Sequence, residues 1–116
     1  MSFTIDCSNF SVEPYEAPIA KEKLLSGAPV ETIESLYENA QGKFFVGYWS
    51  STPGKWRVHY DEEEYFEFLE GEAIIEGEDG EKRHCLPGTK LVIQAGFKGT
   101  WETITDCRKL YVIALN

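Results

Sequence analysis

Short hydrophobic runs recur about every ten residues from Lys43 onward, and turn-forming residues close each run. Runs of this length, rich in aromatic and β-branched side chains, are typical of strands in an all-β sandwich or barrel. The pattern therefore predicts an all-β fold. The predicted strands are residues 44–50, 56–60, 65–70, 72–76, 82–86, 90–93, 100–105 and 109–115. The predicted turns lie at Pro53-Gly54, Gly71, Asp79-Gly80, Pro87-Gly88 and Ala95-Gly96.

The first 42 residues lack this period. Prolines at positions 14, 18 and 29, together with Gly27, break any long helix. We therefore predict a mostly extended arm at residues 1–42, followed by one β-domain at residues 43–116. Short strands are expected within the arm near Phe10 to Val12 and near Glu31 to Leu36.

Residues 54–71 combine two strand-like runs with an acidic corner between them. In the first run Arg57 and His59 alternate with Trp56, Val58 and Tyr60, and the second run, Tyr65 to Leu69, follows the acidic corner and is rich in aromatic residues. Alternate residues of a strand share one face, so Arg57 and His59 are predicted to point the same way. A folded-over pair of strands is then expected to bring Arg57, His59 and Glu64 together.

Composition narrows the class of protein. A chain of 116 residues with 42% hydrophobic residues suits one compact domain. Its formal charge of −9 repels phosphate backbones and anionic bilayers, so neither nucleic acid nor a membrane is expected as a partner. The N-terminus shows no basic leader followed by an apolar core, and we expect a cytoplasmic location. The three cysteines are widely spaced, which favours reduced thiols.

A family resemblance rests on the spacing of His59, Glu64 and Gly71. The chain resembles the first motif of the cupins, in which His-x-His is followed after four residues by Glu, so that Arg57 falls at the first His position. It looks most similar to a subfamily of unknown function that includes ethanolamine-utilisation cupins and is related to ureidoglycine aminohydrolase. The features that carry this resemblance are Gly47-Tyr48-Trp49, Pro53-Gly54-Lys55-Trp56, Leu69-Glu70-Gly71, Glu78-Asp79-Gly80, Pro87-Gly88, Gly96-Phe97-Lys98-Gly99-Thr100-Trp101 and Arg108-Lys109-Leu110-Tyr111.

The resemblance covers about residues 43 to 114 and implies a fold. It implies a single-domain jelly-roll barrel, also called a double-stranded β-helix, preceded by the extended arm. Cupins commonly pack such an arm on the barrel or on a second subunit, so the resemblance also implies a homodimer.

The metal site of the cupins is incomplete in this sequence. When the second cupin motif is placed on Gly88, Gly99 stands at the His position and Thr103 at the Asn position. Two of the three usual histidines are therefore absent. A tight transition-metal site needs three or four protein ligands, so we predict no cofactor. The alternative is a divalent metal held weakly by His59 and Glu64.

Several residues are predicted to line a pocket in the barrel. Strand parity places Gly99, Trp101 and Thr103 on one face, and Trp101 is expected to fill the vacant metal end of the cavity, where Gly99 leaves room for it. In the last strand, one of two alternating pairs faces inward: either Lys109 and Tyr111, or Leu110 and Val112. The predicted ligand-binding residues are Arg57, Gln94, Trp101, Thr103, Lys109 and Tyr111.

Three classes of function remain open. The first is a cupin that binds a small polar or carboxylate-bearing metabolite, for which Arg57 offers a guanidinium. The second is an enzyme that acts on a small nitrogenous or hydroxylated metabolite, with His59 and Glu64 as an acid and base or with a weakly bound metal. The third is a structural partner protein. A fold hosts many activities, so the resemblance does not choose among them.

Overall fold

The computed structural model describes residues 3–8 and 12–116, and in this part of the chain every regular element is a β-strand. The strands are β1 (Tyr15–Pro18), β2 (Leu24–Gly27), β3 (Val30–Glu38), β4 (Phe44–Ser51), β5 (Gly54–His59), β6 (Glu63–Gly77), β7 (Lys82–Cys85), β8 (Lys90–Ile93) and β9 (Lys98–Ala114). Within the same residues no helix is long and apolar enough to cross a membrane.

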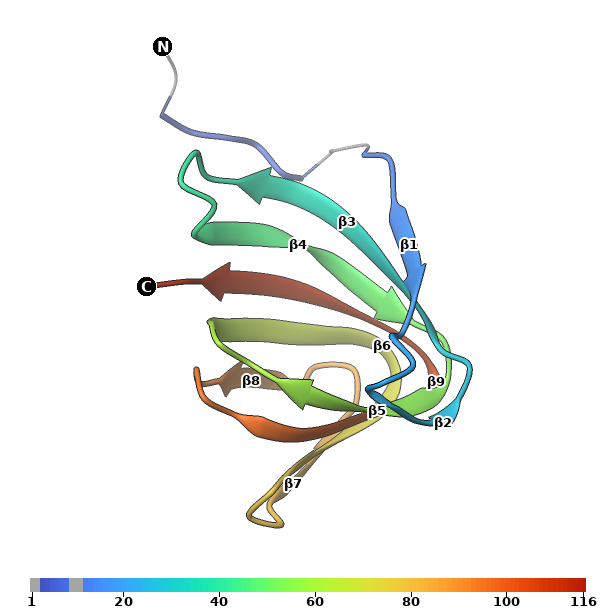
Figure 1. Cartoon of the computed structure of the whole chain (residues 1–116). Helices are drawn as coiled ribbons and strands as arrows, with labels where there is room; N and C mark the ends of the chain where they lie inside the picture. Colours follow the sequence, from blue (N-terminus) through green and yellow to red (C-terminus); the bar gives the residue numbers. More distant parts are fainter. Residues whose placement is uncertain (1–2, 9–11) are drawn as a thin grey trace.

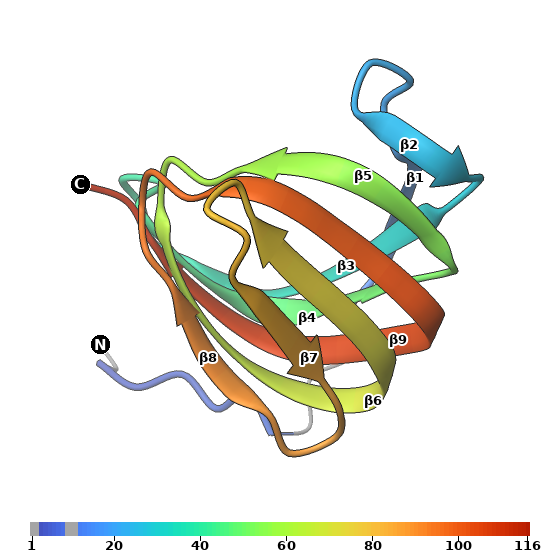
Figure 2. The same cartoon turned by 90° about the horizontal axis from the view of Figure 1, so that it is seen from below.

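Two long strands, β6 and β9, form the centre of the fold. They pair with each other in antiparallel register from Glu63 opposite Ala114 to Gly77 opposite Gly99. The other edge of β9 pairs with β5 along its first half and with β4 along its second half. The other edge of β6 pairs with β8 and then with β7. Because both long strands bend, the sheet curls into the barrel seen in Figures 1 and 2, which confirms the predicted all-β jelly roll.

The predicted turn at Gly71 is wrong, because residues 65–70 and 72–76 belong to one bent strand, β6. Gly71 adopts a φ of 85°, and the register with β9 shifts on both sides of it. A Cβ at this position would collide with the backbone carbonyl of Asp106. Gly71 therefore supports a bulge, which bends a strand and increases its twist without ending it. The predicted strands 100–105 and 109–115 are likewise joined in β9, which ends at Ala114.

The N-terminal stretch contributes strands to the same sheet. β3 pairs with β4, β1 pairs with β3, and β2 pairs with β5. The strand expected at residues 31–36 is confirmed and extends over all of β3. The strand expected near Phe10 to Val12 falls largely outside the described residues, and Val12 itself is not in a strand. Packing of the arm on a second subunit stays a prediction, as does the homodimer.

The core fills the inside of the curled sheet. Trp101 lies at its centre, with its ring centroid 5.2 Å from that of Trp49 and 6.1 Å from that of Phe66. Burying each of these aromatic side chains contributes on the order of 2 kcal/mol or more. Gly99 does not make room for the Trp101 indole, as the sequence suggested. Its missing Cβ instead allows the backbone carbonyl of Glu76 to approach.

Candidate functional site

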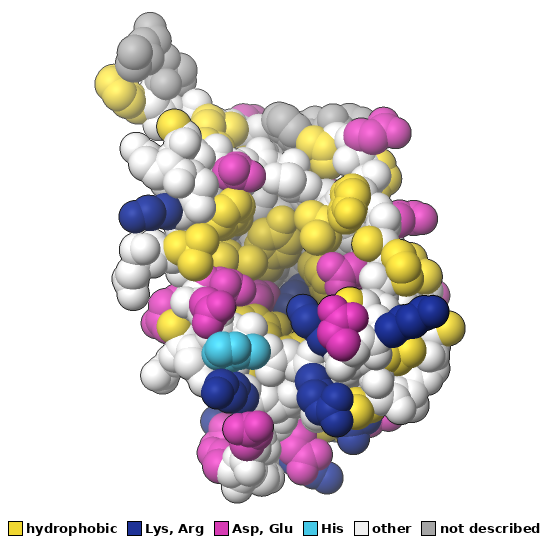
Figure 3. All heavy atoms as spheres, viewed as in Figure 1, with side chains coloured by type: hydrophobic (Ala, Val, Ile, Leu, Met, Phe, Trp, Pro, Cys, Tyr) yellow, Lys and Arg dark blue, Asp and Glu magenta, His cyan; other side chains and the backbone are white. Residues whose placement is uncertain are grey.

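A cavity of about 410 Å³ opens into one end of the barrel. In Figure 3 this face of the molecule is hollowed, with hydrophobic side chains on one side of the hollow and carboxylates with basic side chains on the other. The lining comes from six strands, β1, β3, β4, β5, β6 and β9, and from the loops that follow β1 and β5. The lining residues are Pro18, Ile19, Ala20, Lys23, Glu31, Trp49, Trp56, Arg57, Val58, His59, Tyr60, Glu62, Glu64, Trp101, Lys109, Tyr111 and Ile113.

All three tryptophans of the chain line this cavity. Trp49 comes from β4, Trp56 from β5 and Trp101 from β9. The ring of Trp49 contacts both of the others, with its centroid 6.2 Å from that of Trp56 and 5.2 Å from that of Trp101. The indoles therefore form an aromatic wall, and we expect their fluorescence to respond to a molecule bound beside them.

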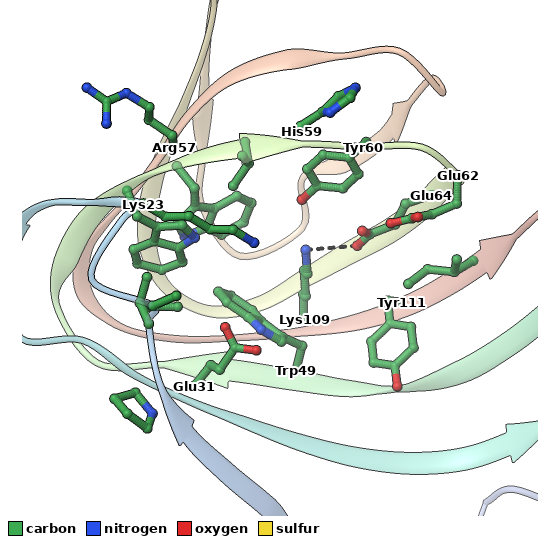
Figure 4. Close-up of a pocket in the computed structure, with 17 residues that line it drawn as sticks. Lys23, Glu31, Trp49, Arg57, His59, Tyr60, Glu62, Glu64, Lys109 and Tyr111 are labelled. Atoms are coloured by element: carbon green, nitrogen blue, oxygen red, sulfur yellow. Dashed lines mark ion pairs between the residues drawn. The ribbon is translucent and has the colours of Figure 1, made fainter.

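A buried ion pair crosses the cavity floor (Figure 4). The Nζ of Lys109 lies 2.8 Å from Oε2 of Glu64, and each side chain is 5% exposed. Lys109 points inward because the second half of β9 alternates between buried and partly buried residues, which places Cys107, Lys109 and Tyr111 on the inner face. The choice that the sequence left open in this strand is thus settled in favour of Lys109 and Tyr111.

Three aromatic rings surround the ammonium group of Lys109. Its Nζ lies 4.8 Å from the ring centroid of Trp49 and 4.6 Å from the centroids of Phe66 and Trp101. Each ring face attracts a cation by about 0.5–2 kcal/mol, with the larger value for desolvated sites. Burial by itself lowers the pKa of Lys109, but attraction to Glu64 outweighs it, so that the net pKa is raised. The side chain therefore keeps its positive charge at neutral pH.

One oxygen of this pair is incompletely satisfied. Oε2 of Glu64 is fully buried, and the group that contacts it is the ammonium of Lys109, which occupies one of its lone pairs. Buried carboxylate oxygens normally accept hydrogen bonds. Glu64 thus retains capacity to accept a hydrogen bond from a bound molecule, and the Lys109 ammonium has three N–H groups, more than its contact with one oxygen requires.

Other ionisable groups around the cavity are shifted toward their neutral forms. Burial raises the pKa of Tyr60 to about 12, so its hydroxyl stays protonated and can donate a hydrogen bond. Burial also raises the pKa of Glu31, against the attraction of Lys23. The pKa of Glu62 is raised by burial first and then by the carboxylate of Glu64. The cavity therefore combines one buried cation with several carboxylates that are partly desolvated.

Thr103 supports Trp101 from behind and does not line the cavity. The indole Nε1 of Trp101 donates a hydrogen bond of 2.8 Å to Oγ1 of Thr103, and this oxygen lies 2.5 Å from Oγ of Ser51. Ser51, Trp101 and Thr103 are all buried. The hydrogen bonds fix the plane of the indole, so Thr103 positions the aromatic wall.

The predicted inward direction of Arg57 and His59 is wrong. Both side chains are exposed, and Figure 4 shows them on the outer side of β5, pointing away from the cavity. Nε2 of His59 lies 3.4 Å from Oδ1 of Asp61 at the surface. The physical reason is the alternation in β5, where the large apolar residues Trp56 and Val58 occupy the inner face. His59 and Glu64 therefore do not face each other as an acid and base.

Gln94 also lies apart from the cavity. It is exposed in the turn after β8, where its backbone carbonyl accepts a hydrogen bond of 3.2 Å from the N–H of Phe97. Of the residues predicted for the site, Glu64, Trp101, Lys109 and Tyr111 line the cavity, whereas Arg57 and His59 border it on β5 with their side chains turned outward.

The residues of this cavity do not fit the divalent metal that the cupin resemblance implies. Residues 3–8 and 12–116 contain no group of three or more His, Cys, Asp and Glu side chains that could hold a metal ion. Of the two ligands considered from the sequence, His59 points outward and Glu64 is paired with an ammonium group. We therefore derive no chemistry through a metal at this site.

Sequence reasoning missed Tyr60, Glu31 and Lys23 as parts of the cavity. Tyr60 could have been found, because it continues the apolar alternation of Trp56 and Val58 and must share their face. Glu31 and Lys23 reach the cavity through the pairing of β3 and β2 with the barrel strands, and no local pattern of the sequence indicates that pairing.

An antiparallel barrel of this topology, with the motif residue Glu64 facing inward from β6, is a cupin jelly roll. A family model for the EutQ-like cupin domain matches residues 38–111, which is more than half of the chain. The chain belongs to this family. No curated protein matches the chain.

Solved structures share the fold at low sequence identity. A DUF861 family protein of unknown function from Pseudomonas syringae pv. tomato has a TM-score of 0.79 at 20% identity, covering 91% of this chain and 45% of that chain. A protein from Salmonella typhimurium provisionally assigned as ethanolamine utilization protein Q has a TM-score of 0.67 at 18% identity, covering 90% and 98%. The EutQ protein of Clostridium difficile has a TM-score of 0.65 at 17% identity, covering 74% and 63%. The chain thus spans less than half the length of the Pseudomonas protein.

Proposed function

We propose that this cupin binds a small carboxylate-bearing molecule in the cavity of its barrel. The observation that carries the proposal is the buried pair of Lys109 and Glu64, which lies at the cavity floor inside a cage of three aromatic rings. A buried charge is costly unless it is paired and hydrogen-bonded. An ammonium group with spare N–H donors at the bottom of an open cavity is suited to receive an anionic oxygen.

The size and the walls of the cavity support a small ligand. Its volume of about 410 Å³ lies in the lower part of the range of about 300–1,000 Å³ that is usual for ligand pockets. Trp49, Trp56 and Trp101 supply an apolar wall for the carbon skeleton of the ligand. Tyr60 keeps its proton and adds a hydrogen-bond donor for a second polar group.

The test compares a carboxylate with its uncharged amide. Thermal unfolding and tryptophan emission are recorded with sodium propionate and with propionamide, and sodium chloride serves as the control for ionic strength. We expect propionate to raise the Tm and to shift the emission, because it binds beside the indoles, and propionamide to have a much smaller effect. The Arg108→Gln variant, altered on the outer face of the same strand, should respond as the wild type does.

The same experiment can refute the proposal. A panel of propionate, succinate and benzoate that changes neither Tm nor emission beyond the sodium chloride control would contradict binding of carboxylates in this cavity. Equal responses to propionate and propionamide would contradict the role given to the charge, while leaving a pocket for neutral molecules.

A further inference from the structure

Lys109 is paired with Glu64, the residue at the Glu position of the first cupin motif. We infer that the ammonium of Lys109 holds the place beside Glu64 that the cupin resemblance assigns to a divalent metal, and that it binds the carboxylate of the ligand directly. This inference rests on the proposed function and deepens it. In this inference Lys109 supplies the positive charge of the site, and the ligand is an acid that binds without chelating a metal ion.

Lys109 stands too close to Glu64 for a metal ion to bind there as well. Glu64 stands at the Glu position of the first cupin motif, and its Oε2 lies 2.8 Å from Nζ of Lys109. A metal ion bound to a carboxylate oxygen lies about 2 Å from it. A divalent ion at Glu64 would therefore stand within a few ångströms of the ammonium, where two positive charges repel strongly because little water screens them. The two cations are mutually exclusive at this position.

The ammonium of Lys109 is held permanently in its position. The aromatic rings of Trp49, Phe66 and Trp101 lie within 4.8 Å of Nζ and hold the ammonium by cation–π attraction. Glu64 compensates its charge, and each of the two side chains is 5% exposed. A cation attached to β9 by its own side chain cannot be lost by dilution or chelation, in contrast to a bound metal.

An ammonium group and a metal ion favour different classes of ligand. A metal ion offers several open coordination positions, so it favours acids with a second donor atom that completes a chelate ring. An ammonium group offers N–H donors to single oxygen atoms and gains nothing from a chelate ring. The expected ligands are therefore simple monocarboxylates. An α-hydroxyl group, as in lactate, should change the affinity less than about tenfold relative to propionate.

Chemical rescue tests the role of the charge. Lys109→Ala removes three methylene carbons and the ammonium, which together correspond to n-propylammonium. We expect the variant to have a lowered Tm and to lose its response to propionate. Added n-propylammonium should raise its Tm and restore the propionate-induced shift in tryptophan emission, while n-propanol, which fills the same space without charge, should restore neither.

Each other outcome contradicts the inference. Equal rescue by n-propanol would mean that Lys109 only fills volume, and no rescue by either compound would mean that its charge is not used by the ligand. Stoichiometric binding of Mn²⁺, Fe²⁺, Ni²⁺ or Zn²⁺ to the wild type, lost in Glu64→Gln, would show that a metal occupies the site. Binding of lactate much more than tenfold tighter than binding of propionate would also indicate a metal at the site.

A second variant tests the inference even if Lys109→Ala fails to fold, and it distinguishes a failure of the inference from a failure of the proposed function. In Lys109→Met/Glu64→Gln both charges are removed together, so no uncompensated charge is left in the core. This variant should fold and should respond equally to propionate and propionamide. If the wild type responds to propionate and the double variant keeps that response, the inference fails and the proposed function stands. If the wild type itself never responds, the proposed function fails first.

Discussion

Lys109 and Arg108 are neighbours in β9 that point to opposite faces of the sheet. Nη1 of Arg108 lies 2.6 Å from Oε1 of Glu34, and its guanidinium carbon lies 4.2 Å from the ring centroid of Tyr48. Lys109 likewise has one carboxylate partner at 2.8 Å and aromatic rings within 5 Å. The two cations thus have the same kinds of contact, one inside the barrel and one outside it.

What differs between the two pairs is burial. The side chains of Arg108 and Glu34 are 29% and 28% exposed, whereas those of Lys109 and Glu64 are 5% exposed. Exposed pairs contribute little because water and salt screen them. A buried pair costs much desolvation energy to form, and breaking it by removing one partner leaves an uncompensated charge in the core. The local contacts therefore do not show which ion pair has the larger effect on stability. The burial of each pair in the fold shows it.

Removing the inner cation should have the largest effect on stability. Lys109→Met leaves the Glu64 carboxylate buried without its partner, so we expect a loss of about 3–5 kcal/mol in the free energy of unfolding. The measurement is denaturant unfolding at neutral pH. Lys109→Met/Glu64→Gln should recover most of the loss, and a double variant as unstable as the single one would show that packing, and not charge, causes the effect.

Alkaline pH should break the inner pair and spare the outer one. The folded-state pKa of Lys109 is raised above 10.5, so the stability it contributes is fully present below that pH and is lost as the pH rises through the folded pKa. Tyr60 acts in the same direction, because between pH 10 and its folded pKa of about 12 it ionises in the unfolded state first. Unfolding midpoints should fall over this range in the wild type and in Arg108→Gln. The fall should be smaller in Lys109→Met and in Tyr60→Phe.

Substituting an aromatic ring should destabilise the protein more on the inner face of the sheet than on the outer face. Trp101→Phe removes the indole hydrogen bond to Thr103 and weakens the cage around Lys109, so we expect a loss of about 1–3 kcal/mol. Tyr48→Leu removes the ring under Arg108, where an exposed cation–π contact is worth about 0.5–1 kcal/mol. Denaturant unfolding of both variants measures the difference. Equal losses would mean that burial does not separate the two faces.

The smallest effect should come from the outer cation. Arg108→Gln should cost less than about 1 kcal/mol, because its pair with Glu34 is partly exposed. The loss should shrink further when unfolding is measured in molar sodium chloride, which reduces the Debye length to about 3 Å. A loss in Arg108→Gln that matches Lys109→Met would contradict the account of burial.

The sequence predicts the fold well because its strands are short, alternating and closed by recognisable turns. It also predicts Glu64 and Trp101 at the inner face, and the structure bears out both positions. The two errors on β5 have one cause: Arg57 and His59 were oriented by matching histidines of a motif, whereas the inner face is set by where the large apolar side chains can be buried.

The ion pair between Lys109 and Glu64 could not be predicted from the sequence. Lys109 and Glu64 are 45 residues apart, and they meet because β6 and β9 pair in antiparallel register, with Phe68 opposite Lys109 and Glu64 opposite Ile113. A strand pattern gives the face on which a side chain lies, but it does not give the side chain's partner across the barrel. The cage around Lys109 depends on that pairing in the same way.

The most direct test of the central role of Lys109 is a titration of tryptophan emission with lactate and with lactamide. It is carried out on the wild type and on Lys109→Met/Glu64→Gln, both of which keep all three reporter indoles. We predict that the wild type binds lactate at least about tenfold more tightly than lactamide, and that the double variant binds both equally. A double variant that keeps the wild-type preference for lactate would contradict the assignment of Lys109 as the group that holds the carboxylate.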